Sequence, residues 1–152
     1  MEKIISALLD EIRALGIDAV LMPQTVSANR PRIDLYIAGI ELAGIDHQNP
    51  DKGNKGWERI TFTAEFKSEG THSIWLTDAI IASRNLLPLN ESPMRLTVSV
   101  KPDHDCKTHL TAHWRRQAAG RFEYPNEEES SMPVRYIEPW EVSIAYPAHI
   151  IG

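Results

Sequence analysis

The chain has 152 residues, of which 42% are hydrophobic and 24% charged, and its formal net charge is -5. This composition is ordinary for a globular domain that can bury a core, and it argues against global disorder. The acidic balance disfavours specific binding to a phosphate backbone, and no apolar run is long enough to span a membrane. We therefore predict a single domain over residues 1–152, with no membrane and no specific DNA among its partners.

The only cysteine is Cys106, which excludes an intrachain disulfide and fits a reducing compartment. The N-terminal segment does not resemble a signal peptide, because Asp10, Glu11 and Arg13 interrupt its apolar residues. We expect a cytoplasmic protein.

The first third of the chain predicts one helix and two strands. Residues 2–15 carry an apolar stripe at helical spacing, and Gly16 is a plausible stop; the stripe is formed by Ile4, Ile5, Leu8, Leu9, Ile12 and Leu15. A short strand is expected over 18–22. A longer one over 33–42 alternates apolar and polar residues, with Gly39 marking a bulge or a change of face. Residues 43–56 form a long turn-rich loop.

The clearest strand covers 57–67, where the apolar residues at alternate positions are Ile60, Phe62, Ala64 and Phe66. A second helix is expected over 71–87, because Pro88 forbids its continuation. Its main stripe comprises Trp75, Ala79, Ala82 and Leu86, widened by Ile74, Leu76 and Ile80.

In the C-terminal third, apolar and polar residues alternate over 96–100 and again over 110–114, which predicts two more strands. Residues 117–133 contain Gly120 and predict a hairpin tip. The last strand covers 136–146, and we expect it to be broken at Pro139, with Trp140 near an element end.

The order is thus α-β-β-β-α-β-β-β, and the fold class is α+β. Two helices cannot cover both faces of such a sheet. We predict a mixed, mainly antiparallel sheet with both helices packed on one face, which leaves the other face available.

No motif predicts catalysis or cofactor binding. The candidate metal ligands are His104, His109 and His113, but their spacing matches no established zinc pattern. There is no GxSxG nucleophile elbow and neither of the glycine-rich phosphate loops. We therefore predict no catalytic residue, no cofactor and no metal, and the protein is not expected to be an enzyme.

Surface residues remain as the candidates for function. Aromatic residues at element ends and charged loops are typical of interfaces. The interface candidates are Trp57, then Asp46, Asp51, Lys52 and Lys55 in the long loop, and Arg121, Glu127, Glu128 and Glu129 in the hairpin tip.

The order and length of these elements resemble the tail terminator (tail completion) proteins of tailed bacteriophages and prophages. The resembling segments are IISALLDEIRAL, DAVLM, RIDLYIAGIEL, WERITFTAEFKS, SIWLTDAIIASRNLL, MRLTVSV and the closing YIEPWEVSIAYP. They cover nearly the whole chain, although none is a diagnostic motif, and the resemblance does not explain residues 104–113.

The resemblance implies a homohexameric ring in the virion tail, which stops growth of the tail tube. Its expected partners are further copies of itself, the tail tube protein and the head connector protein, and DNA passes through without being specifically bound. The family has no catalytic residues, and its tube-binding surface corresponds by position to residues 43–56 and 117–131. The alternatives are another head–tail adaptor or a baseplate protein, or a small metal-dependent hydrolase that uses the three histidines.

Overall fold

The computed structural model describes residues 1–22, 31–44, 56–70, 73–88, 93–99, 107–125 and 134–148. Over these ranges the elements are, in chain order, α1 (Glu2–Ala14), β1 (Asp18–Leu21), β2 (Arg32–Gly44), β3 (Trp57–Gly70), α2 (Ser73–Arg84), β4 (Met94–Ser99), β5 (Lys107–Arg116), β6 (Arg121–Glu123) and β7 (Val134–Pro147). The predicted α+β class is confirmed. The predicted order is wrong by one strand, because the short β6 lies in the segment expected to be a hairpin tip.

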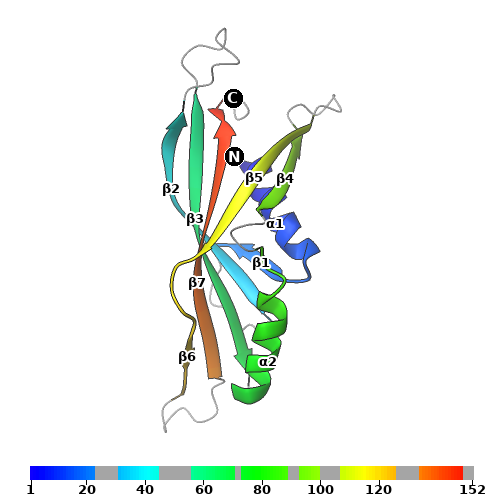
Figure 1. Ribbon diagram of the computed structural model, residues 1–152, viewed down its shortest axis with the longest axis vertical. Helices are drawn as coiled ribbons and strands as arrows, with labels where there is room; N and C mark the ends of the chain where they lie inside the picture. The colour runs from blue at the N-terminus through cyan, green and yellow to red at the C-terminus, as the bar shows by residue number, and fades with distance from the viewer. Residues whose placement is uncertain are drawn as a thin grey trace.

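All seven strands belong to one mixed sheet, which curls along its length (Figure 1). The main path through the sheet is β1-β2-β3-β7-β5-β4, and β6 pairs with β7 beside this path. Only β1 and β2 are parallel, and every other pair is antiparallel. The mainly antiparallel sheet predicted from the sequence is therefore confirmed.

Strand β7 lies at the centre of the sheet and is not broken at Pro139, so that prediction is wrong. On one side it pairs with β3 along its whole length. On the other side it pairs first with β6 and then with β5, and Pro139 falls between these two partners. The Pro139 carbonyl accepts a hydrogen bond from Gln117 N at 2.9 Å. The N and C=O of an extended residue point to the same side of the strand. The nitrogen of Pro139, which carries no hydrogen, therefore points to the side of β7 where β6 has ended and β5 has not yet begun to pair, so no N–H donor is required there.

A bulge in β2 keeps its apolar residues on one face. The register shifts by one residue between Ile37 and Gly39, as the sequence predicted for this region. Ile37 then lies opposite Phe62, and Ile40 lies opposite Ile60. Without the extra residue, Ile40 would point to the opposite face of the sheet, because side chains alternate along a strand.

The hydrophobic core forms on one face of the sheet, which we call the core face. Alternate residues of β2, β3, β4, β5 and β7 are buried there, including the four apolar β3 residues expected from the sequence. Helix α1 contributes Ile4, Leu8 and Ile12, which have no exposed surface. Burying each such side chain contributes about 1.5–3 kcal/mol. The predicted stripe of α1 is therefore confirmed, and the opposite face of the sheet is called the outer face below.

The predicted stripe of α2 is wrong. Leu76 and Ile80 are buried, but Ala79, Ala82 and Leu86 are exposed. This helix is apolar around most of its circumference, so periodicity did not distinguish the face that packs against the sheet. The side chains of Ile74 and Trp75 lie outside the described part of the chain.

Candidate functional site at the open edge of the sheet

The second half of β2 lacks a strand on its outer side. Strand β1 pairs with Arg32–Leu35 only, and β3 occupies the opposite side of β2. Within the described ranges, residues Ile37–Gly44 therefore have a free row of backbone groups, which we call the open edge. The open edge lies at the upper margin of the sheet in Figure 1. Unpaired N–H and C=O groups in such a row are a template for an added strand.

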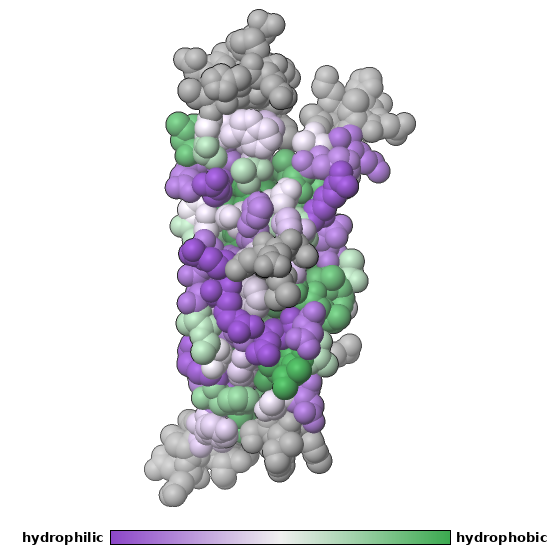
Figure 2. All heavy atoms as spheres, viewed as in Figure 1, coloured by the Kyte–Doolittle hydropathy of each residue, from purple (hydrophilic) through white to green (hydrophobic). Residues whose placement is uncertain are grey.

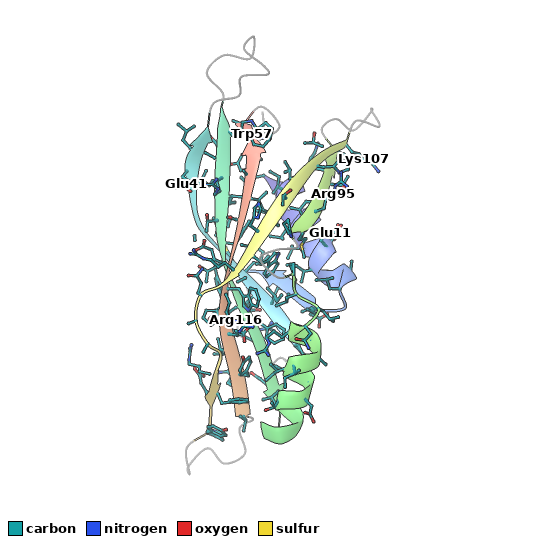
Figure 3. All side chains as sticks on the ribbon, viewed as in Figure 1. Glu11, Glu41, Trp57, Arg95, Lys107 and Arg116 are labelled. Atoms are coloured by element: carbon teal, nitrogen blue, oxygen red, sulfur yellow. The ribbon has the colours of Figure 1, made fainter. Side chains whose placement is uncertain are left out.

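Large apolar side chains are exposed along the open edge. Ile40 is 57% exposed and Leu42 is 74% exposed, and both lie on the core face with Ile37. Natural edge strands are usually protected by lysine, proline, an inward charge or a β-bulge. The open edge has register shifts between Ile37 and Gly39 and between Leu42 and Gly44, and its regular stretch runs between them. The only charge in this stretch is Glu41, which pairs across the strands with Arg59 at 3.1 Å. Figure 3 shows Glu41 on this margin of the sheet. The chemistry of the edge favours an extended partner with an apolar face.

Among the described strands, β1, β4 and β6 also pair on one side only, and β4 and β6 differ in how well they are protected. Strand β6 pairs only with β7, and the ring of Phe122 stacks on Tyr124, which is 64% exposed. Strand β4 pairs only with β5, but Lys3 donates from Nζ to the Ser99 carbonyl at its end. A lysine at an edge disfavours strand addition, so β6 is the less protected of the two.

The outer face of the sheet carries charged side chains such as Arg59 and Glu65, and Figure 2 shows hydrophilic side chains over much of one side of the molecule. On this face Asp34 of β2 is fully buried, and its carboxylate accepts a hydrogen bond from Arg32 Nε at 2.6 Å and pairs with Lys67 Nζ at 2.9 Å. Burial alone would lower the pKa of Lys67, but the hydrogen bond and charge of Asp34, together with Glu65, raise it. Replacing one partner would leave a buried charge, so this face is poorly suited to apolar contact with another subunit.

The predicted site residues are dispersed. Trp57 is half-buried at the start of β3, where it lies opposite Gly44 at the end of the open edge. Arg121 is exposed on β6 and pairs with Glu123 at 3.4 Å. Trp140 lies in the middle of β7 and is buried, contrary to the prediction. The loop candidates lie outside the described residues; these are Asp46, Asp51, Lys52, Lys55, Glu127, Glu128 and Glu129.

The candidate metal ligands do not form a described cluster. His109 and His113 are exposed on the outer face of β5, and His109 Nδ1 lies 3.3 Å from Thr97 Oγ1. His104 lies outside the described ranges. Within those ranges no three His, Cys, Asp or Glu side chains are close enough together to hold a metal ion.

Glu138 is a buried carboxylate that the sequence did not single out. It lies on the core face of β7 with no exposed surface, and Tyr136 Oη and Trp140 Nε1 donate to it at 2.5 and 2.7 Å. Arg84 of α2 and Arg116 of β5 complete the network at 3.5 and 3.3 Å. Each carboxylate oxygen accepts a hydrogen bond from an aromatic side chain and lies beside one guanidinium group, so the arrangement joins the helix to the sheet. A Glu between apolar residues carries no local signal of this role.

Gly120 is required because the chain passes directly over this network. A Cβ atom at residue 120 would overlap the Tyr136 hydroxyl. We expect Gly120→Ala to displace Tyr136 from Glu138 and to lower the free energy of unfolding by about 3 kcal/mol. Chemical denaturation measures this loss. The matched control is Gly44→Ala, where no heavy atom lies within 4 Å of the added Cβ; equal losses in the two variants would contradict the close approach.

Two tyrosines give the protein a defined response to alkaline pH. Burial raises the pKa of Tyr136 and of Tyr146 to about 12, assisted by the hydrogen bonds and charges of Glu138 and Glu58 respectively. Unfolded tyrosine ionises near pH 10. The free energy of unfolding should therefore be unaffected by these groups below about pH 10 and should fall as pH rises from about 10 to about 12.

Absorbance titration of tyrosinate in the folded protein checks this expectation. Of the four tyrosines, two should ionise only near pH 12. Tyr136→Phe and Tyr146→Phe should each remove one of these late-titrating groups. Complete ionisation by pH 10.5 in a still-folded protein would contradict the burial of both hydroxyls.

No protein-family model matches the chain, and no curated protein matches it. Neither described helix has the length and apolar character that a membrane-crossing helix needs.

Proposed function

We propose that this protein is a structural assembly protein whose copies join laterally into a ring, in the manner of a phage or prophage tail terminator. The observation that carries the proposal is the open edge, where exposed Ile40 and Leu42 accompany a row of backbone groups that no described strand pairs with. A lone subunit would leave this edge in water, where it would favour uncontrolled strand pairing. A closed ring satisfies the edge in every copy and leaves no free end.

The placement of the helices supports lateral rather than face-to-face joining. We infer that α1 and α2 shield the same face, because buried residues of both belong to the one cluster formed on the core face. The outer face carries the Asp34 ion pairs. With one face covered and the other charged, the edges are the surfaces best suited to a neighbouring copy.

The proposed ring ends the tail tube and presents its opposite side to the head connector. The protein would act in the host cytoplasm during assembly and remain in the virion tail. The net charge of -5 favours passage of DNA without adhesion, because like charges repel. The role requires no catalytic residue, cofactor or metal.

Electron microscopy of negatively stained, purified protein tests the ring directly. We expect uniform closed rings with a central opening. Open filaments would indicate edge pairing without closure and would contradict a terminator role, while isolated small particles would contradict lateral assembly altogether. Adding polymerised tail tube from the same phage should place rings only at tube ends.

A further inference from the structure

We propose that the open edge of β2 in one copy is filled by β6 of the next copy, in an antiparallel pairing that sets Ile40 opposite Phe122. The inference rests on the proposed lateral assembly and names the two strands that make it.

The sheet topology sets the directions in which these two strands can pair. The sheet contains the run β2-β3-β7-β6, in which each neighbouring pair is antiparallel. Strands β2 and β6 therefore lie at opposite edges of this run and point in opposite directions. Ile40 lies level with Ile144 of β7, whereas Phe122 lies opposite Tyr136, eight residues earlier on the same strand. Both free edges lie on the left in Figure 1. A second copy therefore presents its β6 antiparallel to the open edge of β2 when it is turned about the strand direction and shifted by these eight residues along it. Such a contact joins two different surfaces, so it propagates from copy to copy and closes into a ring when the rotation allows.

The faces of the two strands also match. Phe122 lies opposite Tyr136, and Ile40 lies opposite Ile60, so both belong to the core face. Pairing Ile40 with Phe122 therefore continues one apolar face across the subunit boundary. Tyr124, exposed and stacked on Phe122, extends the same apolar surface.

Charged side chains favour this register over the register that is shifted by two residues. When Ile40 lies opposite Phe122, Glu41 lies opposite Arg121 on the outer face. Both side chains are largely exposed, at 64% and 60%. A shift that instead sets Leu42 opposite Phe122 would place Glu41 against Glu123, and directly opposed like charges destabilise strand pairs.

Strand β4 is the less suitable partner. Four successive antiparallel pairs connect β2 to β4 through β3, β7 and β5, so β4 points in the same direction as β2. An equally oriented copy would thus add β4 in parallel, which is slightly less stable per residue. The Lys3 ammonium on the Ser99 carbonyl further opposes a strand at that edge.

Cysteine cross-linking tests the pairing. In a Cys106→Ser background, Ile40→Cys and Phe122→Cys are produced separately, co-expressed, and combined in one chain. Directly opposed residues bring Cα atoms within the range that a disulfide spans. We expect covalent dimers from the co-expressed single variants, little product from either alone, and a ladder of covalent oligomers from the double variant. The control joins Glu41→Cys to Arg95→Cys of β4, because both of these side chains lie on the outer face.

A charge-reversal series provides a second test that does not alter the core. Glu41→Arg and Arg121→Glu should each weaken assembly by about fivefold, and combining them should restore it. Cross-linking through Arg95→Cys, or additive losses in the double reversal, would overturn the inference. If wild-type oligomers form without the expected cross-link, only the strand assignment fails. If no oligomer forms at any concentration, the proposed function fails with it.

Discussion

Replacing Glu138 by alanine should lower the free energy of unfolding by about 3–5 kcal/mol, the largest loss expected from any single substitution described here. The substitution removes the acceptor shared by Tyr136 Oη and Trp140 Nε1. It also removes the negative charge with which the guanidinium groups of Arg84 and Arg116 both pair. A protein of this size is stable by only about 5–15 kcal/mol, so the variant should unfold at much lower denaturant concentration.

The matched control is Glu141→Ala on the same strand. Glu141 lies on the outer face, is partly exposed, and pairs with Arg115 at 3.9 Å. Exposed ion pairs of this kind contribute about 0–1 kcal/mol. Glu138→Gln should lie between the two variants, because the amide keeps one acceptor oxygen. Similar stabilities for Glu138→Ala and Glu141→Ala would contradict the structural role of the network.

Introducing lysine at both Ile40 and Leu42 should convert the assembled protein into folded monomers. Both side chains are exposed in a single copy, so their replacement should leave the fold of the subunit intact. In the assembly the same positions would bury two charges at the strand interface, which opposes pairing. The lost apolar burial alone should weaken association by about a hundredfold or more.

Sedimentation velocity measures the expected dissociation, and circular dichroism checks that the fold is retained. The control carries lysine at His109 and Thr111, two exposed residues of β5 away from the open edge. This variant should assemble like the wild type. Assembly that survives both edge lysines would rule out the open edge as the joining surface.

The spacing of apolar residues was sufficient to predict an element and its buried face where only one face of that element is buried. The stripe of α1 and the alternation of Ile60, Phe62 and Phe66 in β3 predicted their elements and their buried faces. Pattern failed in α2, since apolar residues surround most of that helix. It also failed at Pro139, because the cost of a proline depends on which neighbour lies beside it, and sequence spacing does not give strand order.

The candidate site was harder to predict for the same reason. Ile40 and Leu42 look like core residues in the sequence, and only the sheet order shows that β1 ends before reaching them. Strand β6 has three residues, too few for a periodic signal. Glu138 resembles a solvent-exposed position until the donors from α2, β5 and β7 are brought together. Each of these features depends on contacts between residues far apart in the chain.

Light scattering coupled to size-exclusion chromatography gives the absolute mass in solution and so shows whether the open edge joins identical copies. We expect a concentration-independent species of about six times the 17.2 kDa subunit mass. A particle that remains at 17.2 kDa up to millimolar concentration would contradict it.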